Sequence, residues 1–163
     1  MKNKIFVGEF IGSALLVMAI VGSGIMAESL TNDTAVILLA NAVATGAALY
    51  FLIVSISDIS GAHFNPFVTL AMYLSKKIKS QLLPVYFTAQ ILGCLTGVML
   101  ANFFFDYSLI ELSSKSRSGI NVFVSEIIAT FGLIFIIFRT IKGGKVLVAT
   151  SVATFITAGY WFT

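Results

Sequence analysis

Five long apolar runs, separated by short polar segments, dominate the chain. They cover roughly residues 5–27, 35–57, 82–105, 120–138 and 146–163. A helix that crosses a membrane needs roughly 20 apolar residues to span about 30 Å of hydrocarbon. The runs do not show the ten-residue alternation of a membrane β-barrel, so they predict an all-α integral membrane protein. The first run follows two lysines, as a signal peptide does, but its core exceeds the roughly 7–15 residues typical of one and contains Glu9.

Composition supports a membrane protein. The chain is 58% hydrophobic and 10% charged, with a mean hydropathy of +1.01. A soluble fold of 163 residues cannot bury so much apolar surface, so part of it must face lipid. The net charge of +3 does not indicate a nucleic-acid partner, because the basic residues form short clusters between apolar runs. Pairs of glycines four residues apart, at 8 and 12 and at 93 and 97, favour close helix packing.

Basic residues also predict the orientation, because they stay preferentially on the cytoplasmic side. With the N-terminus inside, only two basic residues fall on the outer side, Lys115 and Arg117. A cytoplasmic N-terminus in a multi-pass protein of the inner or plasma membrane is therefore expected. The basic residues predicted on the inner side are Lys2, Lys4, Lys76, Lys77, Lys79, Arg139, Lys142 and Lys145.

The segment between the second and third runs begins as a polar loop and continues as a short apolar run. The ten residues from Asn65 to Leu74 would make a helix of about 15 Å, half the thickness of a bilayer. We therefore predict a re-entrant half-helix over 65–75. Asn65 suits the N-cap and Pro66 the first helical position, which leaves the Asn65 amide nitrogen as a donor toward a cavity. This donor and the positive helix end suit a water oxygen and oppose cations and protons.

These residues resemble a known family. The stretch 60–69 (SGAHFNPFVT) is similar to the first signature of the major intrinsic proteins, the aquaporins and glycerol facilitators, and 9–13 (EFIGS) resembles the family's opening. The stretch 126–130 (EIIAT) parallels 9–13, as expected for inverted repeats. The resemblance implies an aquaporin-like inverted repeat with five transmembrane helices and one re-entrant half-helix. The expected organisation is a first repeat at 1–105, an extracytoplasmic loop at 106–119 and an incomplete second repeat at 120–163. In that scheme the second half-helix and the sixth span are missing, so a fragment is expected, with a degenerate protein as the alternative.

The resemblance also assigns candidate pore residues. Phe67 stands where the family has a small alanine and is expected to alter packing or pore width. Thr45 falls at an aromatic filter position of water-selective members, and the matching window in the last run is Ala158 and Gly159. Small residues there would imply a constriction wide enough for glycerol or neutral metalloid acids as well as water. The pore and motif residues are Gly61, Ala62, His63, Asn65, Pro66 and Phe67.

Few other side chains suggest a catalytic or metal-binding role. Glu9 and Glu126 are ionisable residues inside predicted spans, interpreted as structural acceptors for loop backbone N–H groups, with a functional carboxylate as the alternative. His63 is the only histidine, which argues against a metal site; it either lines the pore or makes a loop contact. Cys94 is the only cysteine and suits a packing role. No metal, no cofactor and no enzymatic activity are predicted.

The predicted function is a passive channel for water and small uncharged solutes, and the resemblance suggests a homotetramer with one pore per subunit. Three alternatives remain. An ion channel with a re-entrant loop would need a carbonyl-rich filter or a ring of charges near Asn65, and the sequence has neither. A membrane enzyme would need an intramembrane pair of catalytic groups. A non-conducting truncated protein or scaffold is the third.

Overall fold

The computed structural model describes residues 1–111 and 117–163, and these residues form helices and no strands. The elements follow the predicted order of two long helices, one short helix and three further helices, with two short 3₁₀ turns. Their bounds are α1 Lys2–Leu30, α2 Thr34–Ser60, α3 Pro66–Leu74, η1 Ser80–Leu82, α4 Leu83–Phe104, α5 Ile120–Thr140, η2 Ile141–Gly143 and α6 Lys145–Gly159.

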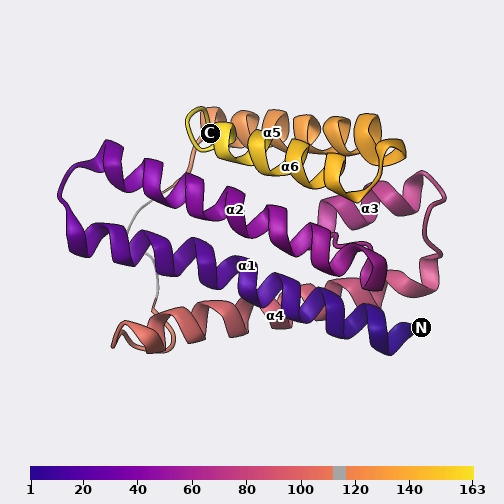
Figure 1. The fold of residues 1–163 in the computed structure, drawn as a ribbon, viewed down its shortest axis with the longest axis horizontal. Helices are drawn as coiled ribbons and strands as arrows, with labels where there is room; N and C mark the ends of the chain where they lie inside the picture. The colour runs from indigo at the N-terminus through magenta and orange to yellow at the C-terminus, as the bar shows by residue number, and fades with distance from the viewer. Residues whose placement is uncertain (112–116) are drawn as a thin grey trace.

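The long helices lie side by side along the longest axis of the molecule (Figure 1). Helix α1 packs between α4 and α2, and α6 packs between α2 and α5. The short helix α3 occupies only one end of the bundle, near the N-terminus of the chain, and contacts α4 and α5 (Figure 1).

Glycines allow the helices to approach closely. A Cβ atom on Gly97 would lie 2.4 Å from the Ala14 carbonyl oxygen, and one on Gly93 would lie 2.5 Å from the Phe10 carbonyl oxygen. A Cβ on Gly46 in α2 would lie 2.1 Å from Thr157 Oγ1 in α6. The backbones of α1 and α4 are therefore in direct contact, as the small-residue spacing predicts.

Four helices are long and apolar enough to cross a membrane: Lys2–Leu30, Thr34–Ser60, Ser80–Phe104 and Ile120–Gly143. Of these four helices, α5 is the least buried: only 11% of its most apolar 18-residue stretch is buried by the rest of the protein. The fifth predicted span is shorter than expected: α6 has 15 residues, or about 22 Å. It ends at Gly159 because the backbone turns there, with Phe162 N–H donating to the Gly159 carbonyl at 3.0 Å.

The main hydrophobic core lies between α2, α3, α5 and α6. Phe64, in the loop between α2 and α3, belongs to this core and packs against α1, where a Cβ on Gly12 would lie 1.9 Å from its ring. The core therefore holds the loop that precedes α3 against the long helices.

Candidate functional site

The start of α3 has the predicted cap. Asn65 Oδ1 accepts hydrogen bonds from Phe67 N–H at 2.8 Å and Val68 N–H at 3.3 Å, and Pro66 occupies the first turn. The nine residues of α3 span about 14 Å. Among the described residues, none accepts a hydrogen bond from Asn65 Nδ2. The amide is therefore free to donate to a solute.

The loop between α2 and α3 has an unusual backbone. Gly61 has a φ of 92°, and Ala62 and Phe64 have φ values of 52° and 49°. Left-handed conformations are costly for residues with a side chain and persist only where the surroundings fix them. Tertiary contacts must therefore hold this loop.

Glu9 provides these contacts from the N-terminal third of α1. It is fully buried, and its Oε1 accepts from Ser60 Oγ at 2.6 Å and His63 N–H at 3.0 Å. Its Oε2 accepts from Phe64 N–H at 2.8 Å and Gln90 Nε2 at 2.8 Å. One carboxylate thus satisfies two loop N–H groups and ties α1 to α2 and α4.

The His63 ring lies in a polar cluster beside the loop. Its Nδ1 is 3.1 Å from Thr69 Oγ1, which in turn accepts from Gln90 Nε2 at 3.0 Å. The ring stacks on Tyr86 with centroids 4.5 Å apart, and the Tyr86 hydroxyl donates to the Ser60 carbonyl. Burial lowers the pKa of His63 to about 4, so the imidazole is neutral at neutral pH.

A cavity of about 440 Å³ runs past the loop and the tip of α3. Its walls include residues between Thr45 and Asp58 on α2 and between Lys145 and Ile156 on α6, with Tyr160 just beyond α6. Thr45 and Asp58 are separated by thirteen steps along α2, which correspond to about 20 Å of helix, so the cavity extends along much of the bundle. Gly61, Ala62, His63, Phe64 and Asn65 all line it.

At one end of the cavity, Lys145 donates to Asp58 in an ion pair that joins α6 to α2. At the other end, the hydroxyls of Thr45 and Tyr160 lie 2.9 Å apart. The remaining walls are largely apolar and include Leu49, Ile53, Val68, Leu133 and Val152. The cavity therefore has polar groups at its two ends and at the loop.

Several predicted site residues lie elsewhere. Ala158 is exposed, and Gly159 is buried but absent from the cavity wall. Phe67 is 61% exposed and also lies outside the wall. The Glu126 side chain is 58% exposed, and its carboxylate lies 3.8 Å from Arg117. In the described part of the chain, no backbone N–H donates to Glu126 in the way that the loop donates to Glu9.

Sequence analysis does not identify Gln90, Tyr86 or Tyr160. Gln90 has a detectable signal, because it is a polar residue inside an apolar run, whereas the two tyrosines resemble ordinary interfacial aromatics. Their partners lie 21 to 115 residues away, so local patterns do not reveal their roles.

The model of the major intrinsic protein family matches residues 2–160. The chain belongs to the major intrinsic protein family. It is 43% identical over 157 residues to the aquaglyceroporin AqpS of Rhizobium meliloti (strain 1021), covering 96% of this chain and 67% of that protein. It is 34% identical to the probable aquaporin TIP2-2 of Oryza sativa subsp. japonica, covering 87% of this chain and 58% of that protein.

The fold of this family member also matches a solved structure. The X-ray structure of the aquaglyceroporin from Plasmodium falciparum superposes with a TM-score of 0.85, at 23% identity, over 99% of this chain and 72% of that one. The all-helical, multi-pass membrane fold predicted from the sequence is therefore confirmed. The chain spans about two thirds of the first relative's length and less of the second's.

Proposed function

We propose that this protein forms a passive channel for water and small uncharged solutes, such as glycerol or neutral metalloid acids. One observation carries the proposal: the cavity extends from Asp58 and Lys145 at one end to Thr45 and Tyr160 at the other, and passes Asn65 between them. The names of two relatives, an aquaglyceroporin and a probable aquaporin, support the same class of solute.

The polar groups along the cavity fit neutral solutes. Asn65 Nδ2 offers a donor, and the described residues donate no hydrogen bond to the carbonyl groups from Gly61 to Phe64. A water molecule or hydroxyl passing between apolar walls can thus replace some of its lost hydrogen bonds at the loop. An ion would lose far more hydration energy, and the positive end of α3 opposes cations and protons.

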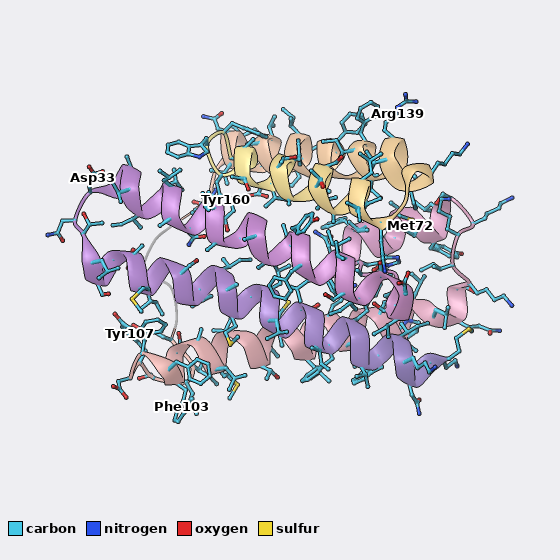
Figure 2. All side chains as sticks on the ribbon, viewed as in Figure 1. Asp33, Met72, Phe103, Tyr107, Arg139 and Tyr160 are labelled. Carbon is cyan, nitrogen blue, oxygen red and sulfur yellow. The ribbon has the colours of Figure 1, made fainter. Side chains whose placement is uncertain are left out.

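We also propose a membrane location, an orientation in that membrane and an oligomeric state for this protein. The N-terminus and Arg139 lie at the same end of the bundle (Figures 1 and 2), which favours a cytoplasmic N-terminus. We expect a plasma or inner membrane location and a homotetramer with one pore per subunit. The exposed apolar surface of α5 suits contact with lipid or with another subunit.

The test is stopped-flow light scattering on proteoliposomes that contain the purified protein. We expect water and glycerol permeability above that of protein-free liposomes, with no ion current in planar bilayers. Permeability equal to that of empty liposomes, from protein whose helical circular dichroism is intact, would overturn the channel and favour the non-conducting scaffold. An ion current would favour the re-entrant ion channel.

A further inference from the structure

A second cavity lies between α5 and α6 and shares no wall residue with the main cavity. It is an open groove of about 370 Å³, which falls within the roughly 300–1,000 Å³ of small-ligand sites. The proposed channel makes no use of this groove. Its walls come from the C-terminal end of α5 and the middle of α6: Ile136, Arg139, Thr140, Ser151, Thr154 and Phe155.

Arg139 is the charged residue of the groove. It lies in the last turn of α5 and is exposed, at the end of the bundle that holds the N-terminus (Figures 1 and 2). Lys145 and Arg117 each have a carboxylate partner, but no described residue forms an ion pair or a hydrogen bond with the Arg139 guanidinium. The groove therefore has an uncompensated positive charge, carried by a planar fork of N–H donors that matches a phosphate group.

The hydroxyl groups of the groove divide into one donor and two acceptors. Thr140 and Thr154 donate to carbonyls of their own helices at 2.7 and 2.8 Å. Their protons are engaged, so only their lone pairs remain for a ligand. Ser151 Oγ has no hydrogen-bond partner among the described residues, and its proton is free to donate. The groove can therefore donate to a phosphate from Arg139 and Ser151 and accept from an alcohol at the two threonines.

The other end of the groove is apolar. The Phe155 ring packs on the α5 backbone at Gly132, where a Cβ atom would lie 2.6 Å from the ring. Gly132 and Arg139 are seven steps apart along α5, or about 10 Å of helix. Since α5 is long and apolar enough to cross a membrane, the groove runs from a charged end near the membrane surface to an apolar end within the hydrocarbon.

We propose that this groove binds an anionic phospholipid, with its phosphate at Arg139 and Ser151 and an acyl chain along Ile136 and Phe155. Charge complementarity selects this occupant: none of the six wall residues is acidic, and a zwitterionic lipid would bring its own cation to Arg139. A free anion would gain nothing from the apolar end. The inference uses the proposed orientation, which places Arg139 in the cytoplasmic leaflet, where anionic lipids give the surface its negative potential.

Native mass spectrometry of the delipidated protein in detergent tests this binding, with phosphatidylglycerol and phosphatidylcholine titrated separately. We expect tighter binding of phosphatidylglycerol. Arg139→Gln should weaken that binding by about tenfold or more, because it removes charge-assisted hydrogen bonds. Lys142→Gln is the matched control: it removes the same charge at the same end of the bundle but lies outside the groove wall, so it should change the affinity much less.

Ser151→Ala should weaken phosphatidylglycerol binding by about fivefold, the effect of one net hydrogen bond. Equal affinity for the two lipids, or equal losses in Arg139→Gln and Lys142→Gln, would overturn the inference. Helical circular dichroism of each variant should match the wild-type protein, because the Arg139 and Lys142 side chains are exposed.

Two further measurements separate the lipid from other occupants. Inorganic phosphate should not displace phosphatidylglycerol, and displacement would assign the groove to a free anion. The same spectra count subunits: a change in subunit number in Arg139→Gln, with bound lipid unchanged, would make the groove a contact between copies of the chain. Either result would overturn the inference. Absence of water flux would overturn the proposed channel instead and would leave the lipid affinities as they are.

Discussion

Glu9 is the residue whose replacement should damage this structure most. It is fully buried and accepts four hydrogen bonds, two from loop N–H groups and two from the side chains of Ser60 and Gln90. In Glu9→Gln, one oxygen remains as an acceptor and an NH₂ group, itself a donor, replaces the other. Two of the four donors then face another donor instead of an acceptor.

The magnitude follows from these contacts. A buried donor without an acceptor costs about 1–3 kcal/mol, so Glu9→Gln should lower the free energy of unfolding by about 2–6 kcal/mol. At about 2–4 °C per kcal/mol for a domain of this size, Tm should fall by on the order of 10 °C. Glu126→Gln is the matched control, because that side chain is 58% exposed and lies 3.8 Å from Arg117. An exposed ion pair contributes about 0–1 kcal/mol.

The assay is thermal unfolding of both variants in the same detergent, followed by water flux in proteoliposomes. Glu9→Gln should unfold at a lower temperature and conduct less water, because the loop before α3 loses its anchor. Glu126→Gln should resemble the wild-type protein in both measurements. If the two variants unfold at the same temperature, the proposal that Glu9 fixes the loop is refuted.

Three further predictions concern other parts of the same structure. Gly97→Ala should lower Tm, because its Cβ would lie 2.4 Å from a backbone oxygen of α1, whereas Gly22→Ala should not, because its Cβ would meet an ordinary 3.5 Å contact. Asn65→Asp keeps the capping oxygen but removes the amide donor, so stopped-flow measurements should find reduced water flux at nearly unchanged Tm. Burial lowers the pKa of His63 to about 4, so water flux should stay constant from about pH 7.5 to about pH 5.5. The unfolded chain binds this proton near pH 6.5, whereas the folded chain binds it only near pH 4. His63 should therefore destabilise the fold progressively as the pH falls from about 6.5 to about 4, and a series of Tm measurements against pH would record this.

The sequence predicts the parts of the fold that depend on local patterns. Apolar runs locate the long helices to within a few residues at most ends, because a helix in lipid must satisfy its own backbone. The cap at Asn65 and Pro66 is equally local, since both partners of the Asn65 oxygen lie within three residues. The last run is the exception: the backbone turns after Gly159, although the apolar composition continues.

Site residues that depend on distant partners are harder to predict. The family resemblance implies that Ala158 and Gly159 match Thr45 in the last run, yet the side chain that contacts Thr45 in the structure is Tyr160. A difference of two residues rotates a side chain by about 200° around a helix, so a small error in alignment exchanges a lining position for an outward one. The roles of Gln90 and Tyr86 cannot be predicted from local sequence, because they arise only when α4 packs against α1 and the loop.

The two carboxylates have different surroundings among the described residues. Glu9 and Glu126 occupy equivalent places in the stretches 9–13 and 126–130, but one is fully buried and the other largely exposed. The acceptor role of Glu9 comes from residues 51 to 81 positions later in the chain, which bring four donors to it. Without such donors, a carboxylate retains its solvent or an ion-pair partner, as Glu126 does with Arg117. The donors supplied by α2, the loop and α4 therefore make Glu9 the anchor of the cavity wall.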